Sequence, residues 1–255
     1  DRSPRGQEGA TDGDDVSDVV ASASRIGDPA RLRLLSGATG AEIRTFPVAA
    51  EQVFTLTSLG DVDGDRVSDI AMAGQREELA GLEEMVFVVS GATGELLWED
   101  VEAPGVRFVL STAARSDVND DGAAELFFGH IGPDAPVGEV RTLDGTTGSL
   151  LSTIEPPQDS LEFGTRAAEL GDVSADGTPD FLVTDAFGPA SNLALGVAMA
   201  VSGRDHSILW AHSGRRGSDP DAAGQPSFFG NVITPAAADL NGDGIRDIVV
   251  AAHVQ

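Results

Sequence analysis

The sequence contains no cysteine, no tyrosine and no lysine, and only 5% of its 255 residues are aromatic. Without cysteine, the chain can form no disulfide framework and can use no thiol chemistry. It also lacks any apolar run of the roughly eighteen residues that a membrane-spanning helix needs. The hydrophobic content of 41% is enough for a sizeable core. We therefore expect a globular fold with no membrane insertion in this segment.

The charge balance is strongly acidic, because 42 Asp and Glu residues oppose only 16 Arg residues and give a net charge of −26. The Arg residues are scattered, so the chain has no basic patch that would bind phosphate groups, and we expect no nucleic-acid partner. Catalytic motifs of the GxSxG, P-loop and HExxH types are also missing. The four histidines, His130, His206, His212 and His253, lie in different contexts without ligand spacing. We expect no enzymatic activity.

Much of the acidity is concentrated in one short motif. In GDVDGDRVSDIAMAG, residues 60–74, the four aspartates Asp61, Asp63, Asp65 and Asp69 lie within nine residues, immediately before an apolar segment. Carboxylates this close repel one another by several kcal/mol, about 4 kcal/mol per pair at 4 Å and an effective dielectric of 20, unless a cation lies between them. Oxygen ligands at alternate positions of a Gly-containing loop are typical of calcium sites. The segment that follows predicts a strand, so the loop is not an EF-hand.

The motif occurs five times, with copies beginning at residues 10, 61, 117, 172 and 239, which lie 51 to 67 residues apart. The first copy has Ala10 at position 1. The predicted metal ligands are Asp12, Asp14 and Asp18; Asp61, Asp63, Asp65 and Asp69; Asp117, Asn119, Asp121 and Glu125; Asp172, Ser174, Asp176 and Asp180; and Asp239, Asn241, Asp243 and Asp247. We expect the backbone carbonyls at position 7, those of Val67, Ala123, Thr178 and Ile245, to complete each coordination sphere.

An alternative interpretation is that Asp, Asn and Gly only build β-turns in these loops. Five copies in phase, each with an acidic ninth residue, favour Ca²⁺ at several sites instead. A repeat of this length is typical of solenoids and propellers.

The segments between the acidic loops also repeat. Each unit reads as strand, acidic loop, strand, connection, strand, Gly-rich turn and strand, and the turn is SGATG at residues 36–40. Four short strands per unit predict the blade of an all-β propeller. The acidic segment 74–84 is predicted to insert one surface helical turn. Residues 1–9 are predicted to be loose, and the repeats to span residues 10–51, 52–105, 106–160, 161–226 and 227–255.

The acidic loops, together with the Phe-Gly pairs Phe163-Gly164 and Phe229-Gly230, resemble the FG-GAP repeats of integrin α-subunit propellers and their bacterial relatives. The GATG hairpins are similar to those of bacterial FG-GAP proteins, although the GAP tripeptide is absent. The resemblance implies a seven-bladed ring, of which this chain would supply a fragment with three complete blades flanked by two partial ones. Trp98, together with Trp210 at the equivalent position of a later hairpin, also resembles the tryptophan of a blade motif in quinone-dependent dehydrogenases. Those enzymes lack the acidic loops, so we expect both tryptophans to have a packing role.

These observations predict a calcium-binding, extracellular or cell-surface module for adhesion or protein interaction, because weak calcium sites fill only outside the cell. The ligand would meet connections on the face opposite the metal loops, such as residues 130–137, 185–192 and 213–227. The alternative is a glycan-binding propeller, or the non-catalytic scaffold of a polysaccharide-active enzyme. The scarcity of aromatic residues, on which sugars stack, disfavours it.

Overall fold

The fold was obtained as a computed structural model. It describes residues 16–25, 28–78, 81–101, 107–113, 117–132, 137–158, 160–186, 195–214, 229–230, 232–235, 240, 242 and 247–251. Within these ranges the chain forms β-strands and no helix, which confirms the all-β prediction. The described residues accordingly include no helix that could cross a bilayer.

The strands are β1 (Val19–Arg25), β2 (Asp28–Leu35), β3 (Glu42–Pro47), β4 (Gln52–Gly60), β5 (Asp69–Glu78), β6 (Gly81–Val89), β7 (Leu96–Val101), β8 (Arg107–Ala113), β9 (Leu126–Ile131), β10 (Glu139–Leu143), β11 (Leu150–Ile154), β12 (Phe163–Gly171), β13 (Asp180–Asp185), β14 (Val197–Val201), β15 (Ile208–Ser213), β16 (Val232–Pro235) and β17 (Ile248–Ala251).

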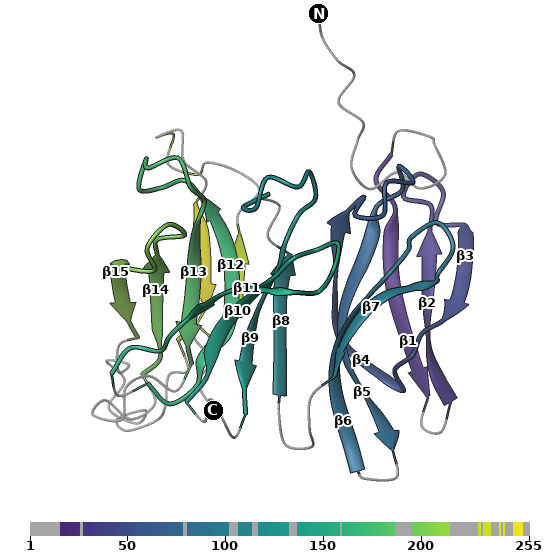
Figure 1. The fold of residues 1–255 in the computed structure, drawn as a ribbon, viewed down its shortest axis with the longest axis horizontal. Coiled ribbons are helices and arrows are strands. Elements are labelled where there is room, and N and C mark those ends of the chain that lie inside the picture. Colours follow the sequence, from purple (N-terminus) through teal and green to yellow (C-terminus); the bar gives the residue numbers. More distant parts are fainter. Residues whose placement is uncertain are drawn as a thin grey trace, which may run out of the picture.

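The strands form five antiparallel sheets in chain order, which we call blades 1 to 5. Blades 2, 3 and 4 have four strands each, β4–β7, β8–β11 and β12–β15. Blade 1 has three strands, β1–β3, and blade 5 has two, β16–β17. The first strands β4, β8, β12 and β16 contact one another in sequence, and the sheets follow one another across the molecule in Figure 1. The prediction of three complete blades flanked by two partial ones is therefore confirmed.

Each middle strand packs against two neighbouring blades, because successive side chains of a strand point to opposite faces of its sheet. In β5, Met72 belongs to the core between blades 1 and 2, whereas Ala73 belongs to the core between blades 2 and 3. Phe127 of β9 stacks on Phe181 of β13, with their ring centroids 4.1 Å apart. Burial of each such phenylalanine side chain contributes about 2–3 kcal/mol to the free energy of unfolding. The blades are therefore held to one another by apolar layers as well as by the chain.

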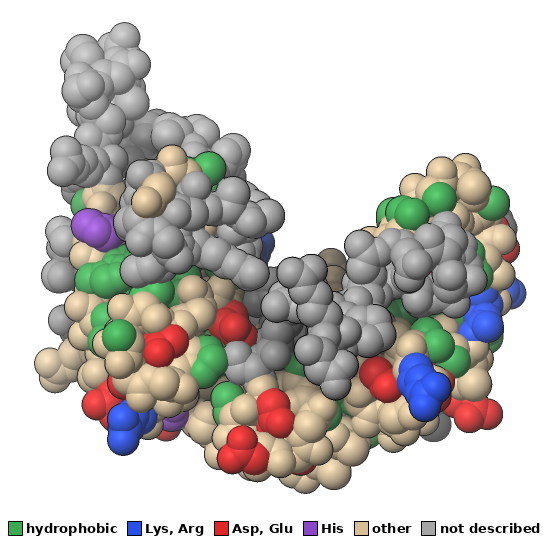
Figure 2. All heavy atoms as spheres, turned by 90° about the horizontal axis from the view of Figure 1, so that it is seen from above, with side chains coloured by type: hydrophobic (Ala, Val, Ile, Leu, Met, Phe, Trp, Pro, Cys, Tyr) green, Lys and Arg blue, Asp and Glu red, His purple; other side chains and the backbone are tan. Residues whose placement is uncertain are grey.

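The ring is not closed. Figure 2 shows a crescent that is open on one side. Every residue of β9 and β13 is buried, whereas every residue of the last strand, β15, is exposed. Blade 4 therefore ends in an uncovered outer strand.

The helical turn expected within residues 74–84 is not present, and that prediction is wrong. Strand β5 continues to Glu78 and pairs with β6, which begins at Gly81. Arg76 of this extension forms two ion pairs: its Nε lies 3.3 Å from Oε2 of Glu83 on β6, and its Nη1 lies 3.2 Å from Oε2 of Glu99 on β7. Sheet pairing satisfies the backbone here and places opposite charges side by side.

Candidate metal centres

In blades 2, 3 and 4 the acidic loop lies at the same place, between the first and second strands. The loop of residues 61–69 joins β4 to β5, the loop of residues 117–125 precedes β9, and the loop of residues 172–180 joins β12 to β13. Because the first strands of blades 2 to 5 contact one another in order, these loops line up along one edge of the ring. A cavity of about 170 Å³ separates the first two of them and is lined by Asp61 and Asp117.

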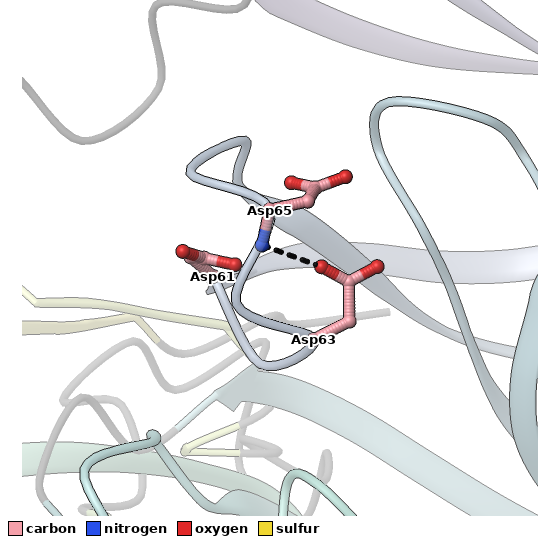
Figure 3. A group of neighbouring side chains, drawn as sticks. All are labelled: Asp61, Asp63 and Asp65. Atoms are coloured by element: carbon pink, nitrogen blue, oxygen red, sulfur yellow. Dashed lines mark hydrogen bonds between the residues drawn. The ribbon is translucent and has the colours of Figure 1, made fainter.

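In the loop of blade 2, the first three predicted ligands converge. One carboxylate oxygen from each of Asp61, Asp63 and Asp65 lies within 4.8 Å of the other two. Figure 3 shows that all three side chains come from the same tight loop. The two oxygens of Asp61 accept hydrogen bonds of 2.8 Å from the backbone N–H groups of Gly64 and Arg66. These two residues have left-handed φ angles of 83° and 74°. The turn therefore folds the loop back on its own first carboxylate.

The ninth residue of this loop, Asp69, does not belong to that group of three and lies fully buried. Its Oδ2 accepts from the N–H of Val62 at 2.8 Å, and its Oδ1 accepts from the N–H of Gly91 at 3.0 Å. Gly91 is the first glycine of the Gly-rich turn between the third and fourth strands. The same bond to the first turn glycine recurs from Asp18 to Gly37 at 3.1 Å and from Asp180 to Gly203 at 3.2 Å.

In blades 1, 2 and 4 the ninth residue thus fastens the acidic loop to the Gly-rich turn of its own blade. The second turn position must be glycine, because an added Cβ on Gly91 would lie 2.0 Å from the carbonyl oxygen of Ser68. Sequence reasoning assigned the ninth residue to metal binding and missed this bond. The sequence did offer a signal for this bond: an acidic ninth residue recurs together with a turn glycine about twenty residues later.

In the loop of blade 3, a different set of acidic residues converges. Carboxylate oxygens of Asp117, Asp121 and Glu125 lie within 4.8 Å of one another. The side-chain amide of Asn119 donates to Oδ2 of Asp121 at 3.2 Å and to Oδ2 of Asp144 at 2.9 Å. Asp144 takes the place that serine holds in the other Gly-rich turns, and it was not among the predicted site residues.

Glu125 combines full burial with an unsatisfied carboxylate oxygen. The residue is fully buried, and its Oε2 accepts from the N–H of Val118 at 2.9 Å. Its Oε1 has no hydrogen-bond partner within the described part of the chain. An unsatisfied buried carboxylate oxygen is costly, which makes such an atom a natural cation ligand.

Burial also raises the pKa of both deeply placed ninth residues. The pKa of Glu125 is raised to about 7, mainly because its carboxylate is desolvated; the charges of Asp117 and Asp121 contribute to the increase, and the hydrogen bond from Val118 opposes it. The pKa of Asp69 rises to about 6 through burial, against the lowering effect of hydrogen bonds from Gly91 and Val62. In both loops the protein holds a carboxylate where its charge is unfavourable without a counter-ion.

The loop of blade 4 has the same backbone course with weaker ligands. Asp172 accepts from the N–H groups of Asp176 and Gly177, at 3.0 and 2.9 Å. The hydroxyl of Ser174 lies 3.5 Å from Oδ1 of Asp172 and 3.4 Å from Oδ1 of Asp180. Serine supplies a neutral oxygen, so this loop does not bring three acidic groups together.

The first and last loops are described only in part. Asp12, Asp14, Asp239, Asn241 and Asp243 lie outside the described residues. The ninth residues of these loops are described: Asp18 bonds to Gly37, as above, and Asp247 accepts from the N–H of Leu240.

The donor set fits a hard divalent cation. Carboxylate, amide, hydroxyl and backbone carbonyl oxygens are the groups that calcium prefers, and the described loops offer no sulfur and no imidazole. Of the histidines, His130 is buried on β9 with Nδ1 3.3 Å from Oε1 of Glu139, and His212 lies beside Trp210. Neither joins a described acidic cluster.

Comparison with known proteins gives likenesses of the fold. No protein-family model and no curated protein matches the chain. A structure of the Dos1 propeller superposes with a TM-score of 0.44 at 13% identity, over 77% of this chain and 47% of that one. A rhamnogalacturonan lyase from Bacillus licheniformis superposes with a TM-score of 0.49 at 16% identity, over 89% and 49%. The chain spans just under half the length of each. The propeller expected from the sequence is present in the structure, and membership of the FG-GAP family stays a prediction.

Proposed function

We propose that this protein is a calcium-stabilised β-propeller module that acts outside the cell in adhesion or protein interaction, without catalytic activity of its own. The observation that carries the calcium assignment is the convergence of three carboxylates in each of two loops, one of them with a buried, unpartnered oxygen on Glu125. The residues proposed to hold calcium are the nineteen ligands predicted from the sequence, including Asp69, Asp180 and Asp247, whose carboxylates also bond to backbone N–H groups.

The proposed role of the ion is structural. A cation among Asp61, Asp63 and Asp65 would replace mutual repulsion with shared attraction at the junction of β4 and β5. With a dissociation constant of about 10⁻⁴ M and about 1 mM calcium, each site would stabilise the fold by about 1.4 kcal/mol. The loops of blades 2, 3 and 4 together would then contribute about 4 kcal/mol, a large share of the stability of an ordinary domain.

The proposed location and partner follow from this affinity and from the position of the loops. Sites with the assumed dissociation constant would be empty at cytosolic calcium levels, so a structural role for the ion requires an extracellular setting. With one edge of the ring used for metal, we propose that a protein ligand meets connections on the opposite edge. Those connections, residues 130–137, 185–192 and 213–227, lie largely outside the described residues.

A glycan ligand is the second candidate, favoured by one observation. Trp210 is 38% exposed and lines an apolar groove of about 910 Å³, and an exposed indole ring is a surface on which a sugar can stack. Binding to a glycan array in the presence of calcium would support this candidate, and quenching of Trp210 fluorescence by the bound sugar would locate it.

Thermal unfolding with and without a calcium chelator tests the primary proposal. Loss of about 4 kcal/mol should lower the melting temperature by roughly 8–16 °C for a chain of this size. Excess calcium should restore it, and magnesium should not, because Mg²⁺ demands a stricter octahedral geometry. Identical melting curves in chelator and in calcium would contradict the proposal.

A further inference from the structure

The Gly-rich turn of blade 3 begins with an aspartate, whereas the turns of blades 1, 2 and 4 begin with a serine. In the serine turns the hydroxyl accepts from a backbone N–H group two or three residues ahead, as Oγ of Ser90 does from Thr93 at 3.2 Å. In blade 3 this role falls to Oδ1 of Asp144, which accepts from the N–H groups of Thr146 and Thr147 at 2.9 and 2.7 Å. The turn therefore needs only one oxygen at this position, and aspartate brings a second.

That second oxygen contacts the acidic loop of the same blade. Oδ2 of Asp144 accepts from the side-chain amide of Asn119 at 2.9 Å. The same amide nitrogen donates to Oδ2 of Asp121 at 3.2 Å, and the amide oxygen accepts from the N–H of Asp121 at 2.9 Å. The equivalent loop position is Asp63 in blade 2 and Ser174 in blade 4. Among these three loops, only that of blade 3 pairs an amide with a carboxylate in the turn.

Blade 3 also joins its loop to its turn by a different route from the other blades. In blades 1, 2 and 4 the ninth residue makes this link, as Oδ1 of Asp69 does with Gly91 at 3.0 Å. The ninth residue of blade 3, Glu125, contacts the loop backbone through Oε2, and its buried Oε1 bonds to no group in the described part of the chain. The pair of Asp144 and Asn119 supplies the link instead. An oxygen that is occupied in the other blades is therefore left for a ligand in blade 3.

The turn that carries Asp144 is held in place from the neighbouring blade. Nε1 of Trp98, on β7 of blade 2, donates to the carbonyl oxygen of Gly145 at 2.7 Å. The ring of Trp98 also covers Gly148, where an added Cβ would lie 2.8 Å from Cε3 of the indole. The seam between blades 2 and 3 thus fixes the turn, and with it the carboxylate that faces the acidic loop.

We propose that Asp144 is a positioning residue of the cation site in blade 3. It orients Asn119 beside Asp121 and joins the loop to the turn, which leaves Oε1 of Glu125 available to the ion. This role rests on the proposed cation binding. Asp144 is not itself a ligand, because its carboxylate lies outside the converging group and both of its oxygens accept hydrogen bonds. Loss of a residue that orients a ligand typically lowers metal affinity by about 10- to 100-fold.

The measurement is the occupancy of each site by anomalous diffraction, from crystals soaked in a series of calcium concentrations. Asp144→Ser keeps the turn, because serine forms it in the other blades, and removes the acceptor for Asn119. The calcium concentration that half fills the site in blade 3 should rise by about 10-fold or more. The site of Asp61, Asp63 and Asp65 in the same crystal is the internal reference and should fill as in wild type.

Two further variants separate positioning from the loss of one negative charge. Asp120→Asn removes a charge from the same loop at an exposed position, outside the hydrogen bond between Asn119 and Asp144. It should shift half filling far less than Asp144→Ser does, because salt screens exposed charges. The double variant Asn119→Asp/Asp144→Ser recreates the combination of Asp63 with a turn serine in blade 2. Its site in blade 3 should fill at the wild-type calcium concentration or below.

A shift that is confined to blade 3 and reversed in the double variant is the expected result. Equal half filling of blade 3 in wild type and Asp144→Ser, with calcium present in both blades, overturns the role of Asp144 and leaves the calcium assignment standing. A double variant that fills as weakly as Asp144→Ser, or an equal shift in Asp120→Asn, overturns it as well. Wild-type crystals without calcium in either loop overturn both proposals.

Discussion

Replacing Glu125 by glutamine removes one charge from the acidic cluster of blade 3 and leaves its shape unchanged. The three carboxylates of this cluster lie within 4.8 Å of one another. At that distance a pair of like charges costs about 1 kcal/mol in water and about 3.5 kcal/mol at an effective dielectric of 20. The amide oxygen of glutamine can still accept from the N–H of Val118. Without calcium, we therefore expect Glu125→Gln to be more stable than wild type by about 1–3 kcal/mol.

Calcium should stabilise the Glu125→Gln variant less than it stabilises the wild type. A neutral amide is a poorer calcium ligand than a carboxylate, so the site in blade 3 is lost, and the stabilisation by calcium should fall by about 1.4 kcal/mol. Urea unfolding in chelator and in calcium measures both quantities, and titration calorimetry should show one ion fewer. Glu95→Gln, at an exposed glutamate in the turn of blade 2, is the matched control and should change neither.

The reasoning would be refuted by a Glu125→Gln variant that is less stable than wild type in chelator, since the buried charge would then be favourable on its own. It would also be refuted by a variant that keeps the full wild-type response to calcium.

Two further predictions concern pH and the seams between blades. Because the folded pKa values of Asp69 and Glu125, about 6 and about 7, lie above their ordinary values of 3.8 and 4.5, the calcium-free folded state binds more protons than the unfolded chain between about pH 4 and pH 7. The contribution of these two residues to the free energy of unfolding therefore rises as the pH falls through this window. In chelator, the urea midpoint should be higher at pH 5 than at pH 8, and calcium should reduce this difference. A lower midpoint at pH 5 than at pH 8 in chelator would contradict the prediction. Trp98→Ala should lower the free energy of unfolding by about 3–5 kcal/mol, because it empties the space over Gly148 and removes the hydrogen bond to Gly145. An unfolding midpoint equal to that of wild type would exclude the packing role.

The sequence predicted the blades because their signals are local and repeated. Alternating apolar residues, Gly-rich turns and acidic loops recur in phase, and each repeat supports the others. The error at residues 74–84 has a local cause as well. The charged run Arg76 to Glu78 resembles a surface insertion, whereas in the structure Arg76 pairs with Glu83 on the adjacent strand β6 and with Glu99 on β7 of the same sheet. Such cross-strand pairing depends on register, which residue type alone does not reveal.

The acidic loops were only partly predictable for a related reason. Spacing predicted a converging group of Asp61, Asp63, Asp65 and Asp69, and the first three do converge because they lie in one tight turn. It did not reveal that Asp69 bonds to Gly91, since that contact joins segments 22 residues apart and depends on how the third strand returns beside the second. The seam of Trp98 against Gly148 joins two blades and requires the stacked sheets to be known.

Anomalous X-ray diffraction from crystals grown in calcium is the most direct test of the central claim. We predict anomalous peaks among the carboxylates of Asp61, Asp63 and Asp65 and among those of Asp117, Asp121 and Glu125, with Oε1 of Glu125 facing the second peak. Well-ordered loops without such peaks, at a calcium concentration well above 10⁻³ M, would contradict the account.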